Sequence, residues 1–336
     1  MKILWLYSYK PDYDFDNWLH MRFVEYMHKY SELKVVAYGP DLHISSPEVT
    51  PIRYNPSIDI NTLDKEFHFD AIICNTKSRM FEYYNPHNNT SSGMWLPKDF
   101  SKTKIPKIEI QEDAHYELDG KWYKEMNFDL ILQRHYESSL KDWGIITKWF
   151  PFSVDTKTFC DGHYERINKV CMAGSVNSAY PERQLACNIL NKHQLIEIYS
   201  GKQMIGPKYI QCLKQYVCHL SGSSRYHITP AKMFEIMASG SVLLTNEEKD
   251  LPLLFDEGSY ATYDDKIGSN EEKLVILANK ILTDGHFRRN ITEKAVKCIK
   301  ERHSHDIRIK QLMKIIEYLP TCKNLTDFNI CDKIKE

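Results

Sequence analysis

Short apolar runs recur along the first half of the chain, each followed by polar or turn-forming residues. The first run, KILWLY at residues 2–7, starts almost at the N-terminus. A run of this length bounded by turn residues is typical of a strand that is buried on both faces of a parallel sheet. The other strand-like runs of this half are residues 33–38, 70–74, 107–110, 129–132 and 146–150.

Helical patterns separate several of these runs. Residues 16–30 place their apolar side chains at helical spacing, and residues 136–143 form a second predicted helix. Strands and helices in alternation predict an α/β domain built on a parallel sheet. Residues 44–66 and 76–104 are rich in Ser, Asn, Pro and Thr, so we predict loops or short insertions there.

The second half repeats the alternation, although no sequence repeat relates it to the first. We therefore predict two Rossmann-like α/β domains, residues 1–155 and residues 156–320, followed by a polar tail at residues 321–336. Strands are predicted at residues 169–172, 195–199, 217–220 and 241–244, and helices at residues 182–192, 230–238, 251–255, 271–283 and 288–318, the last as one or two helices.

The composition agrees with two ordinary globular domains. The chain has 336 residues, and a domain usually contains about 100–200 residues. Hydrophobic residues make up 42% and charged residues 26%, which is enough apolar material for two cores. The formal net charge is −1, so the overall balance gives no reason to expect a polyanionic partner.

The sequence indicates neither a secretion signal nor a membrane span. Its first apolar run is short and reaches Lys10 and Asp12 without a small-residue cleavage site. No stretch approaches the roughly 18 apolar residues of a spanning helix. The nine cysteines are odd in number and form no CxxC pair, and Cys74 and Cys171 lie in strand-like runs. We therefore expect a cytoplasmic protein with reduced core cysteines.

The segment TPAKMFEIMASG, which begins at Thr229, carries the clearest chemistry. Thr229 is predicted to cap a helix, Pro230 suits the first helical position, and Gly240 suits the left-handed residue that ends it. Most other side chains are apolar, which leaves Lys232 and Glu235 as polar residues on a buried helix. The free amides at the positive end of this helix, together with Lys232, predict an anion site.

Glu235 lies about one turn beyond this anion site, where its carboxylate can accept hydrogen bonds from ribose hydroxyls. A short helix that binds a diphosphate at its N-terminus and a ribose beside it has the features needed to bind a nucleotide sugar.

The run KMFEIMASGSVLLTN, followed by LPLLFDEGSYATYDD, resembles the nucleotide-sugar segment of retaining glycosyltransferases with two Rossmann-like domains, the GT-B fold. It is most similar to the spore-maturation-protein-like branch of the glycosyltransferase family 4-like enzymes. DLILQRHYESSLKDWGIITKWFPFSVDTKTF, KVCMAGSVNSAYPERQLACNIL and IYSGK resemble further elements of that branch, so the resemblance covers residues 125–320. The first 124 residues match only in pattern.

The resemblance implies roles for the matching residues of this segment. Glu235 would hold the ribose and take part in the catalytic site. Lys232 and the amides that follow Thr229 and Pro230 would face the diphosphate.

The resemblance also extends to residues before this helix. Gly174 and Ser175 would let a backbone amide approach a phosphate, and Arg183 would neutralise the departing diphosphate in catalysis. The strand end at Ser200 and Gly201 would lie near the base. We expect the nucleotide sugar, a UDP- or GDP-sugar, to be a co-substrate, with no cofactor.

His227 marks a departure from the family pattern. The wider family has a Glu eight residues before the Glu that corresponds to Glu235, and His227 stands at that position here. The branch often lacks this first glutamate, so we do not interpret the change as a loss of activity. His227 either contacts the sugar hydroxyls or is structural.

Two loops of the first half are candidates for the acceptor side. Asp113 and His115 follow a predicted strand, at the end where doubly wound sheets bind ligands. The resemblance places an acidic residue and a histidine there, so we expect both near the reacting carbon or the acceptor. Tyr9 and Lys10, in the loop after the first strand, are expected to contact the acceptor.

Structural alternatives accompany these assignments. Glu235 would then be an ordinary surface glutamate, and Arg183 would pair with Glu182 or another helix residue. Asp113 and His115 would only cap a loop.

Two patterns that suggest metal binding are interpreted as structural. His303 and His305 are two residues apart, a spacing that points their side chains away from each other on a helix. Asp14 and Asp16 lie at the start of a predicted helix, where acidic residues act as caps. We therefore expect no metal.

The expected protein is a hexosyltransferase-type glycosyltransferase that transfers a sugar, with retention and without a metal, to a hydroxyl of a glycan, a protein or a modified DNA base. Three alternatives remain. The first is a DNA glycosyltransferase that acts on a hydroxymethylated base, with binding to duplex DNA that depends steeply on salt. The second is a non-catalytic nucleotide-sugar-binding or coat protein, and the third is another two-domain chemistry such as sugar-nucleotide epimerisation. The oligomeric state stays open.

Overall fold

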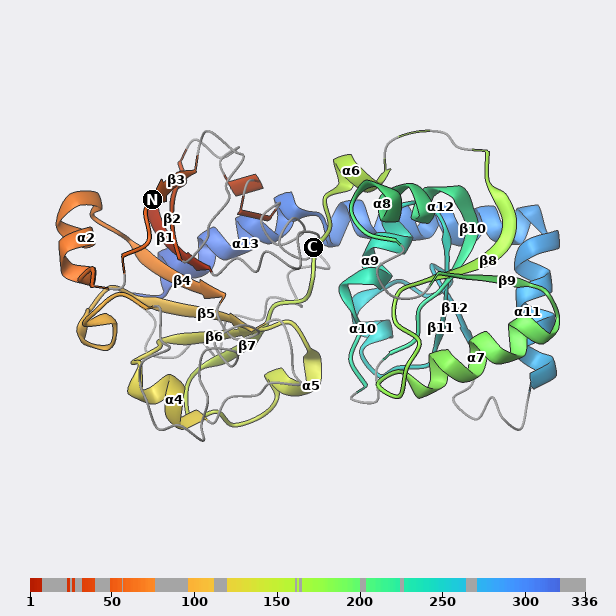
Figure 1. Cartoon of the computed structure of the whole chain (residues 1–336), viewed down its shortest axis with the longest axis horizontal. Coiled ribbons are helices and arrows are strands. Elements are labelled where there is room, and N and C mark those ends of the chain that lie inside the picture. Colours follow the sequence, from red (N-terminus) through yellow and green to blue (C-terminus); the bar gives the residue numbers. More distant parts are fainter. Residues whose placement is uncertain are drawn as a thin grey trace. The chain divides into compact units, whose positions relative to one another are not determined.

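The computed structural model describes residues 1–7, 23–24, 26–27, 32–39, 49–55, 57–75, 96–111, 120–160, 162, 165–199, 204–223, 227–263 and 271–320. These residues form two compact units, each an α/β domain around a parallel sheet (Figure 1). The first unit contains Met1–Pro151 and the described chain from Ile309 onward, and the second contains Phe152–Arg308.

The limits of the units differ from the predicted ones. The chain passes into the second unit after Pro151 rather than after residue 155. Val154 already pairs with the second unit, because its amide donates to the carbonyl of His303 at 2.9 Å. Near the C-terminus, Ile309 and Leu312 belong to the core of the first unit, although we expected the chain up to residue 320 in the second. The apolar periodicity of a terminal helix does not reveal which core it completes.

The sheet of the first unit has seven parallel strands within the described residues, in the order β3-β2-β1-β4-β5-β6-β7. This order is that of a dinucleotide-binding sheet, which winds outward in both directions from its middle. The strands are β1 (Lys2–Tyr7), β2 (Lys34–Tyr38), β3 (Thr50–Ile52), β4 (Ala71–Asn75), β5 (Lys107–Gln111), β6 (Leu130–Gln133) and β7 (Thr147–Trp149).

Strand β1 is buried on both faces, which explains its continuous apolar sequence. Ile3 and Trp5 point into one core, while Leu4 and Leu6 point into the other. Successive side chains of a strand alternate between its two faces, so a strand between two cores needs an apolar residue at every position. This is why the sequence pattern predicts β1 with its correct bounds.

The helices that lie wholly within the described residues of the first unit are short. Residues 44–66, which we predicted as loops, contain β3 and most of α2 (Ile60–Phe67), so that prediction was wrong. Asp59 caps α2 by accepting the Asn61 amide at 2.7 Å, and only Ile60 and Leu63 are buried. Two buried side chains give too weak a periodic signal among Pro and Asn residues. The other helices are α4 (Gly120–Glu125), α5 (Tyr136–Ser139) and a 3-10 turn, η2 (Phe100–Lys102).

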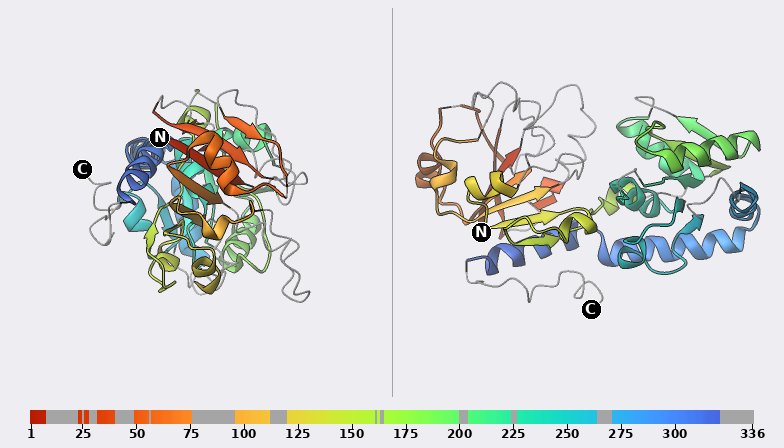
Figure 2. Two further views of the ribbon diagram at one scale, coloured as in Figure 1. Left: turned by 90° about the vertical axis from the view of Figure 1, so that its left-hand side faces the viewer. Right: turned by 90° about the horizontal axis from the view of Figure 1, so that it is seen from below.

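The sheet of the second unit has the strand order β12-β11-β10-β8-β9, again parallel throughout. The strands of the two sheets form separate sets, which the right-hand view of Figure 2 shows. The strands are β8 (Ile167–Ala173), β9 (Ile196–Tyr199), β10 (Tyr216–Leu220), β11 (Val242–Asn246) and β12 (Ala261–Tyr263). Cys171 and Cys218 lie buried on β8 and β10 as free thiols, and Cys74 is a buried free thiol on β4.

Helices connect these strands as the parallel topology requires. Within the described residues, no helix is long and apolar enough to cross a bilayer. The helices are α6 (Thr156–Cys160), α7 (Pro181–Lys192), α8 (Pro207–Gln215), α9 (Ala231–Ala238), α10 (Leu251–Leu254), α11 (Glu271–Thr283), α12 (Gly285–Arg302) and α13 (His305–Tyr318), of which α13 runs from the second unit into the first.

The residues between α12 and α13 explain why the predicted helix of residues 288–318 is divided in two. His303 Nε2 lies 2.7 Å from the carbonyl of Leu254, and its Nδ1 lies 3.2 Å from a guanidinium nitrogen of Arg308. His305 Nδ1 contacts the hydroxyl of Ser153 at 2.9 Å. Both histidines therefore have structural partners.

The winding of the second sheet changes direction between β8 and β10. The chain moves outward from β8 to β9, then returns through α8 to β10 on the other side of β8. The connections therefore diverge at the carboxyl ends of these two strands, and the crevice at such a point is where doubly wound sheets bind ligands.

Candidate functional site

Arg183 spans the point where β8 and β10 diverge. It lies in the first turn of α7, and its guanidinium donates to the carbonyl of Ser175 at 3.0 Å and to that of Gly222 at 2.6 Å. The side chain is 3% exposed and stacks on the ring of Tyr180 at 3.8 Å. Its hydrogen bonds go to backbone carbonyls and not to Glu182, so the structural alternative of an Arg183–Glu182 pair is wrong.

The charge of Arg183 is not neutralised by these partners. Its Nε has no hydrogen-bond partner among the described residues, and burial lowers the pKa of the guanidinium. A buried cation that faces only neutral carbonyls retains an unfavourable desolvation energy. An anion bound beside Arg183 would offset that energy.

Lys232 brings a second cation to the same strand ends. Its ammonium group donates to the carbonyl of Ala173, the last residue of β8, and lies 5.7 Å from the ring centroid of Tyr209. Burial and the neighbouring Arg183 lower the pKa of Lys232 to about 8. A lysine with this pKa binds an anion readily, because the anion restores the stability of its charged form.

Gly174 makes room for this lysine. It follows β8 with a φ of 134°, which side chains rarely adopt, and a Cβ there would overlap with the Nζ of Lys232. Gly222 plays a comparable part after β10, since a Cβ would come within 3.0 Å of Asn246 Oδ1 and 3.4 Å of Arg183 Cβ.

The N-terminus of α9 is uncapped, contrary to our prediction. Pro230 occupies the N-cap position, and Ala231 is the first helical residue. Thr229 does not cap the helix, because its hydroxyl donates to Asp250 Oδ1 at 2.6 Å. Burial raises the pKa of Asp250 to about 6, and this hydrogen bond partly compensates for its desolvation. No side chain of the described residues caps the first amides of α9, so an anion can bind them.

Glu235 lies one turn beyond Lys232 on the same side of α9. It is 6% exposed, and its Oε2 accepts a hydrogen bond from the hydroxyl of Tyr209 at 2.5 Å. Tyr209 comes from α8 and is itself buried. Glu235 is therefore not an ordinary surface glutamate.

His227 contacts a carboxylate that the sequence analysis missed. Its Nδ1 lies 3.4 Å from Oε1 of Glu248, which follows β11. The backbone of His227 has a φ of 54°. His227, which we predicted as a contact of the nucleotide sugar, therefore also has a contact within the protein.

Residues missed by the sequence analysis share one property. Tyr209, Gly222, Glu248 and Asp250 belong to the segments that connect or directly follow strands of the second sheet. A survey of every residue after a predicted strand would have found Gly222 and Glu248. Tyr209 would have required recognition of α8, whose buried residues Tyr209, Cys212 and Leu213 have helical spacing.

The structure brings part of the predicted site together. The predicted residues that surround the ends of β8 and β10 are Gly174, Ser175, Arg183, Thr229, Pro230, Lys232, Glu235 and, before α9, His227. The predictions for Tyr9, Lys10, Asp14, Asp16, Asp113, His115, Ser200 and Gly201 fall outside the described residues and stay predictions.

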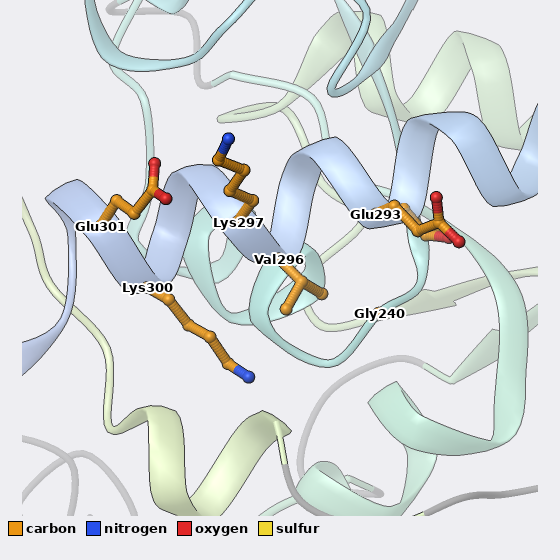
Figure 3. A pocket seen from close by; sticks show the side chains of 7 residues that line it. Gly240, Glu293, Val296, Lys297, Lys300 and Glu301 are labelled. Atoms are coloured by element: carbon orange, nitrogen blue, oxygen red, sulfur yellow. The ribbon is translucent and has the colours of Figure 1, made fainter.

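A separate pocket of about 490 Å³ lies at the opposite end of α9 (Figure 3). Gly240, which follows the helix with a φ of 72° as predicted for its last turn, forms one side of it. Helix α12 forms the other side with Thr292, Glu293, Val296, Lys297, Lys300 and Glu301. A helix of eight residues is about 12 Å long, so this pocket is distinct from the anion site at the N-terminus of α9.

Comparisons with known proteins found one family match and many similar solved structures. Residues 160–314 match the model of a family described as glycosyl transferase-like. This segment begins near α6 and includes nearly the whole second unit. No curated protein matches the sequence significantly.

Solved structures are similar over almost the whole chain. A glycosyltransferase from Rickettsia africae ESF-5 has a TM-score of 0.63 at 9% identity, covering 95% of this chain and 98% of its own. Sucrose-phosphate synthase from Thermosynechococcus elongatus has a TM-score of 0.63 at 10% identity, with coverages of 95% and 99%. HepE from Anabaena, in complex with UDP and glucose, has a TM-score of 0.61 at 10% identity, with coverages of 94% and 99%.

The chain has the GT-B fold. This confirms the predicted fold class of two Rossmann-like domains. Arg183, Lys232 and the start of α9 lie within the segment that matches the family model.

Proposed function

We propose that this protein is a glycosyltransferase that transfers a sugar from a nucleotide sugar to an acceptor hydroxyl. The observation that carries the proposal is the convergence of Arg183, Lys232 and the uncapped N-terminus of α9 at the ends of β8 and β10. Three positive groups around one point fit a diphosphate better than a single phosphate or carboxylate.

The proposed chemistry places these groups where charge develops. When the bond between the sugar and the diphosphate breaks, the leaving diphosphate gains negative charge. Arg183 and Lys232 are fixed beside it by backbone carbonyls, so they stabilise that charge without reorganising. We propose that these two cations replace a divalent metal at the diphosphate. Activity should then survive treatment with EDTA.

Glu235 is the proposed ribose ligand. Tyr209 donates a hydrogen bond to Oε2 of Glu235, which orients the carboxylate, and a carboxylate is a good acceptor for ribose hydroxyls. We propose a UDP- or GDP-sugar as the donor, and UDP-glucose is the first probe because HepE was solved with it. Retention of anomeric configuration and acceptor contacts at Tyr9, Lys10, Asp113 and His115 follow from the family resemblance and belong to the proposal.

The test is a thermal-shift panel of UDP-, GDP-, CDP-, ADP- and dTDP-sugars on the wild type and on Glu235→Ala. A ligand at 100 times its dissociation constant stabilises the native state by about 2.7 kcal/mol. We expect one nucleotide to stabilise the wild type and to lose its effect in Glu235→Ala. Glu247→Ala, at an exposed glutamate after β11, is the matched control and should respond like the wild type.

Activity assays with the nucleotide sugar that stabilises the protein distinguish the alternatives. Stabilisation by a nucleotide sugar with neither transfer nor hydrolysis would indicate a non-catalytic binding protein. Turnover of the nucleotide sugar without any acceptor would indicate epimerisation or a related reaction. No response to any nucleotide, in a wild type that is folded by circular dichroism, would contradict the proposed function.

A further inference from the structure

We propose that Glu248 positions the ring of His227 so that His227 Nε2 accepts a hydroxyl of the transferred sugar. The inference rests on the proposed function and adds a residue for sugar recognition to it. Glu248 is a positioning residue in this account, because it acts through His227 and not on the sugar itself.

Glu248 is held firmly at the end of β11. Its side chain is 5% exposed, and its Oε1 accepts hydrogen bonds from the hydroxyl of Ser223 and, at 2.8 Å, from Asn246 Nδ2. Asn246 is itself fixed, since its Oδ1 accepts the amide of Ser223 at 2.9 Å. These contacts link the ends of β10 and β11 and give the carboxylate one orientation. The third group on the same oxygen is His227 Nδ1, at 3.4 Å.

The backbone of His227 is held in an uncommon conformation. Its φ of 54° lies in the left-handed region, which glycine and asparagine adopt more readily than histidine. A strained residue persists when other interactions determine its position, and such residues gather at functional sites. The conformation presents the imidazole to Glu248, and the side chain is still 67% exposed.

The contact with Glu248 determines which ring nitrogen is available. An ionised carboxylate only accepts hydrogen bonds, so Nδ1 carries the proton and donates it. Nε2 of the neutral ring is then an acceptor, and no described residue contacts it. A sugar hydroxyl is a donor of the right kind for this nitrogen. Without Glu248, the ring would rotate freely and exchange its two tautomers.

The location of His227 assigns it to the sugar and not to the nucleoside. The proposed diphosphate lies at the N-terminus of α9, whose first residue is Ala231. Glu235 lies one turn along this helix, and His227 precedes the helix in the sequence. A nucleotide sugar extends in two directions from its diphosphate. If Glu235 binds the ribose, the sugar extends toward His227.

The test compares binding of UDP and UDP-glucose by calorimetric titration, with GDP and GDP-mannose as a second pair. The dissociation constant of the nucleotide divided by that of the nucleotide sugar measures the contribution of the sugar to binding. We expect this ratio to fall by about three- to tenfold in His227→Asn, the loss of one hydrogen bond, while the affinity for UDP or GDP stays unchanged. Asparagine tolerates the left-handed conformation, so this variant retains the backbone.

Variants of Glu248 test the positioning role. Glu248→Ala should lower the ratio as much as His227→Asn, and the double variant should lower it no further. Glu248→Gln retains an acceptor oxygen, so its ratio should lie between that of Glu248→Ala and that of the wild type. Glu247→Ala, the matched control at the neighbouring exposed glutamate, should leave the ratio unchanged.

The possible outcomes separate this inference from the proposed function. If Glu248→Ala weakens UDP and UDP-glucose equally, or only lowers the melting temperature, Glu248 is merely structural and the inference is overturned. An unchanged ratio in His227→Asn overturns it as well, even if Glu248→Ala does not fold. If the wild type binds neither pair, the proposed function fails first, and the inference fails with it.

Discussion

At the scale of single residues, the chemistry of the site depends on neighbours far away in sequence. In the sequence, Lys232 is an ordinary helical lysine. In the structure, its ammonium group donates a hydrogen bond to the carbonyl of Ala173 at the end of β8. Gly174 then becomes necessary, because only a residue without a Cβ leaves space for that ammonium group. Burial beside Arg183 gives Lys232 a pKa of about 8, near physiological pH.

Replacement of Gly174 by alanine should displace Lys232. Gly206→Ala is the matched control, because Gly206 also has a positive φ, 59°, but a Cβ there meets nothing within 4 Å. Both variants should lose about 1–2 kcal/mol of unfolding free energy from backbone strain. Only Gly174→Ala should also lose affinity for the nucleotide sugar, by tenfold or more. Denaturant unfolding and calorimetric titration measure the two effects, and equal affinities in both variants would refute the role of Gly174.

The pKa of Lys232 predicts how binding depends on pH. Lys232 is cationic below about pH 8 and neutral above it. The diphosphate diester of a nucleotide sugar keeps its charge in this range, so its affinity should fall as the pH rises from about 7 to 9.5. Lys232→Arg stays charged and should bind with nearly constant affinity. Titrations across the range provide the comparison, and a parallel decline in both proteins would exclude Lys232 as the cause.

In the unliganded protein, the pH dependence of the free energy of unfolding should have the opposite sign to that of the binding affinity. Between pH 8 and about 10.5 the unfolded chain keeps the lysine proton that the folded chain has lost. The unfolded state then binds more protons, so the contribution of Lys232 to the free energy of unfolding rises with pH.

At the scale of elements, the start of α9 determines the site. Its N-cap is a proline with a φ of −77° and a ψ of 155°, and no side chain caps the first amides. Most helices use a serine, threonine, asparagine or aspartate at this position. The missing cap makes α9 less stable, but it leaves the amides available to an anion.

Introducing a cap should therefore improve stability and impair binding. The extended backbone of Pro230 suits a capping side chain. We expect Pro230→Asp to raise the free energy of unfolding by about 0.5–1 kcal/mol relative to Pro230→Ala, which provides neither cap nor charge. Pro230→Asp should also weaken nucleotide-sugar binding at least tenfold relative to Pro230→Ala, because its carboxylate occupies the amides and repels the diphosphate. Equal binding by the two variants would place the diphosphate elsewhere.

The elements differ in how well the sequence predicts them. Strands such as β1 and β11 are buried on both faces, so their apolar runs are unmistakable. The three-residue strands β3 and β12 were missed because each is too short to produce a clear period. Helix α8 was missed although its buried residues have helical spacing. Helix α9 was predicted, but its cap and its first residue were wrong.

The contacts of the site are harder to predict than its residues. Tyr209 with Glu235, His227 with Glu248, and Lys232 with Ala173 each join different elements. These pairs depend on the strand order and on the change of winding direction between β8 and β10. A single sequence specifies the elements locally, but it does not state which strands become neighbours.

At the scale of the whole molecule, the end of the chain belongs to the unit in which the chain began. Helix α13 starts at His305 in the second unit, and its later residues complete the core of the first. Leu312 and Ile316 are 0% and 3% exposed there. The stability of the first unit therefore depends on residues that lie more than 150 positions after its last strand.

Removal of one of these side chains should affect the first unit selectively. Leu312→Ala should lower the free energy of unfolding of that unit by about 2–5 kcal/mol, the cost of a core cavity. Lys314→Ala, at an exposed position of the same helix, should have little effect. Calorimetry with and without a nucleotide sugar assigns the transitions, because the ligand should raise only that of the second unit. A loss confined to the ligand-sensitive transition would contradict the assignment of α13.

The most direct test of the whole account is hydrogen–deuterium exchange with and without the nucleotide sugar that stabilises the protein best. We predict slower exchange in the peptides that contain Gly174–Arg183 and Thr229–Glu235, where the ligand covers backbone amides. Peptides of α12 around Lys297, which line the separate pocket, should exchange as before. Protection around Lys297 without protection at the start of α9 would contradict the proposed site.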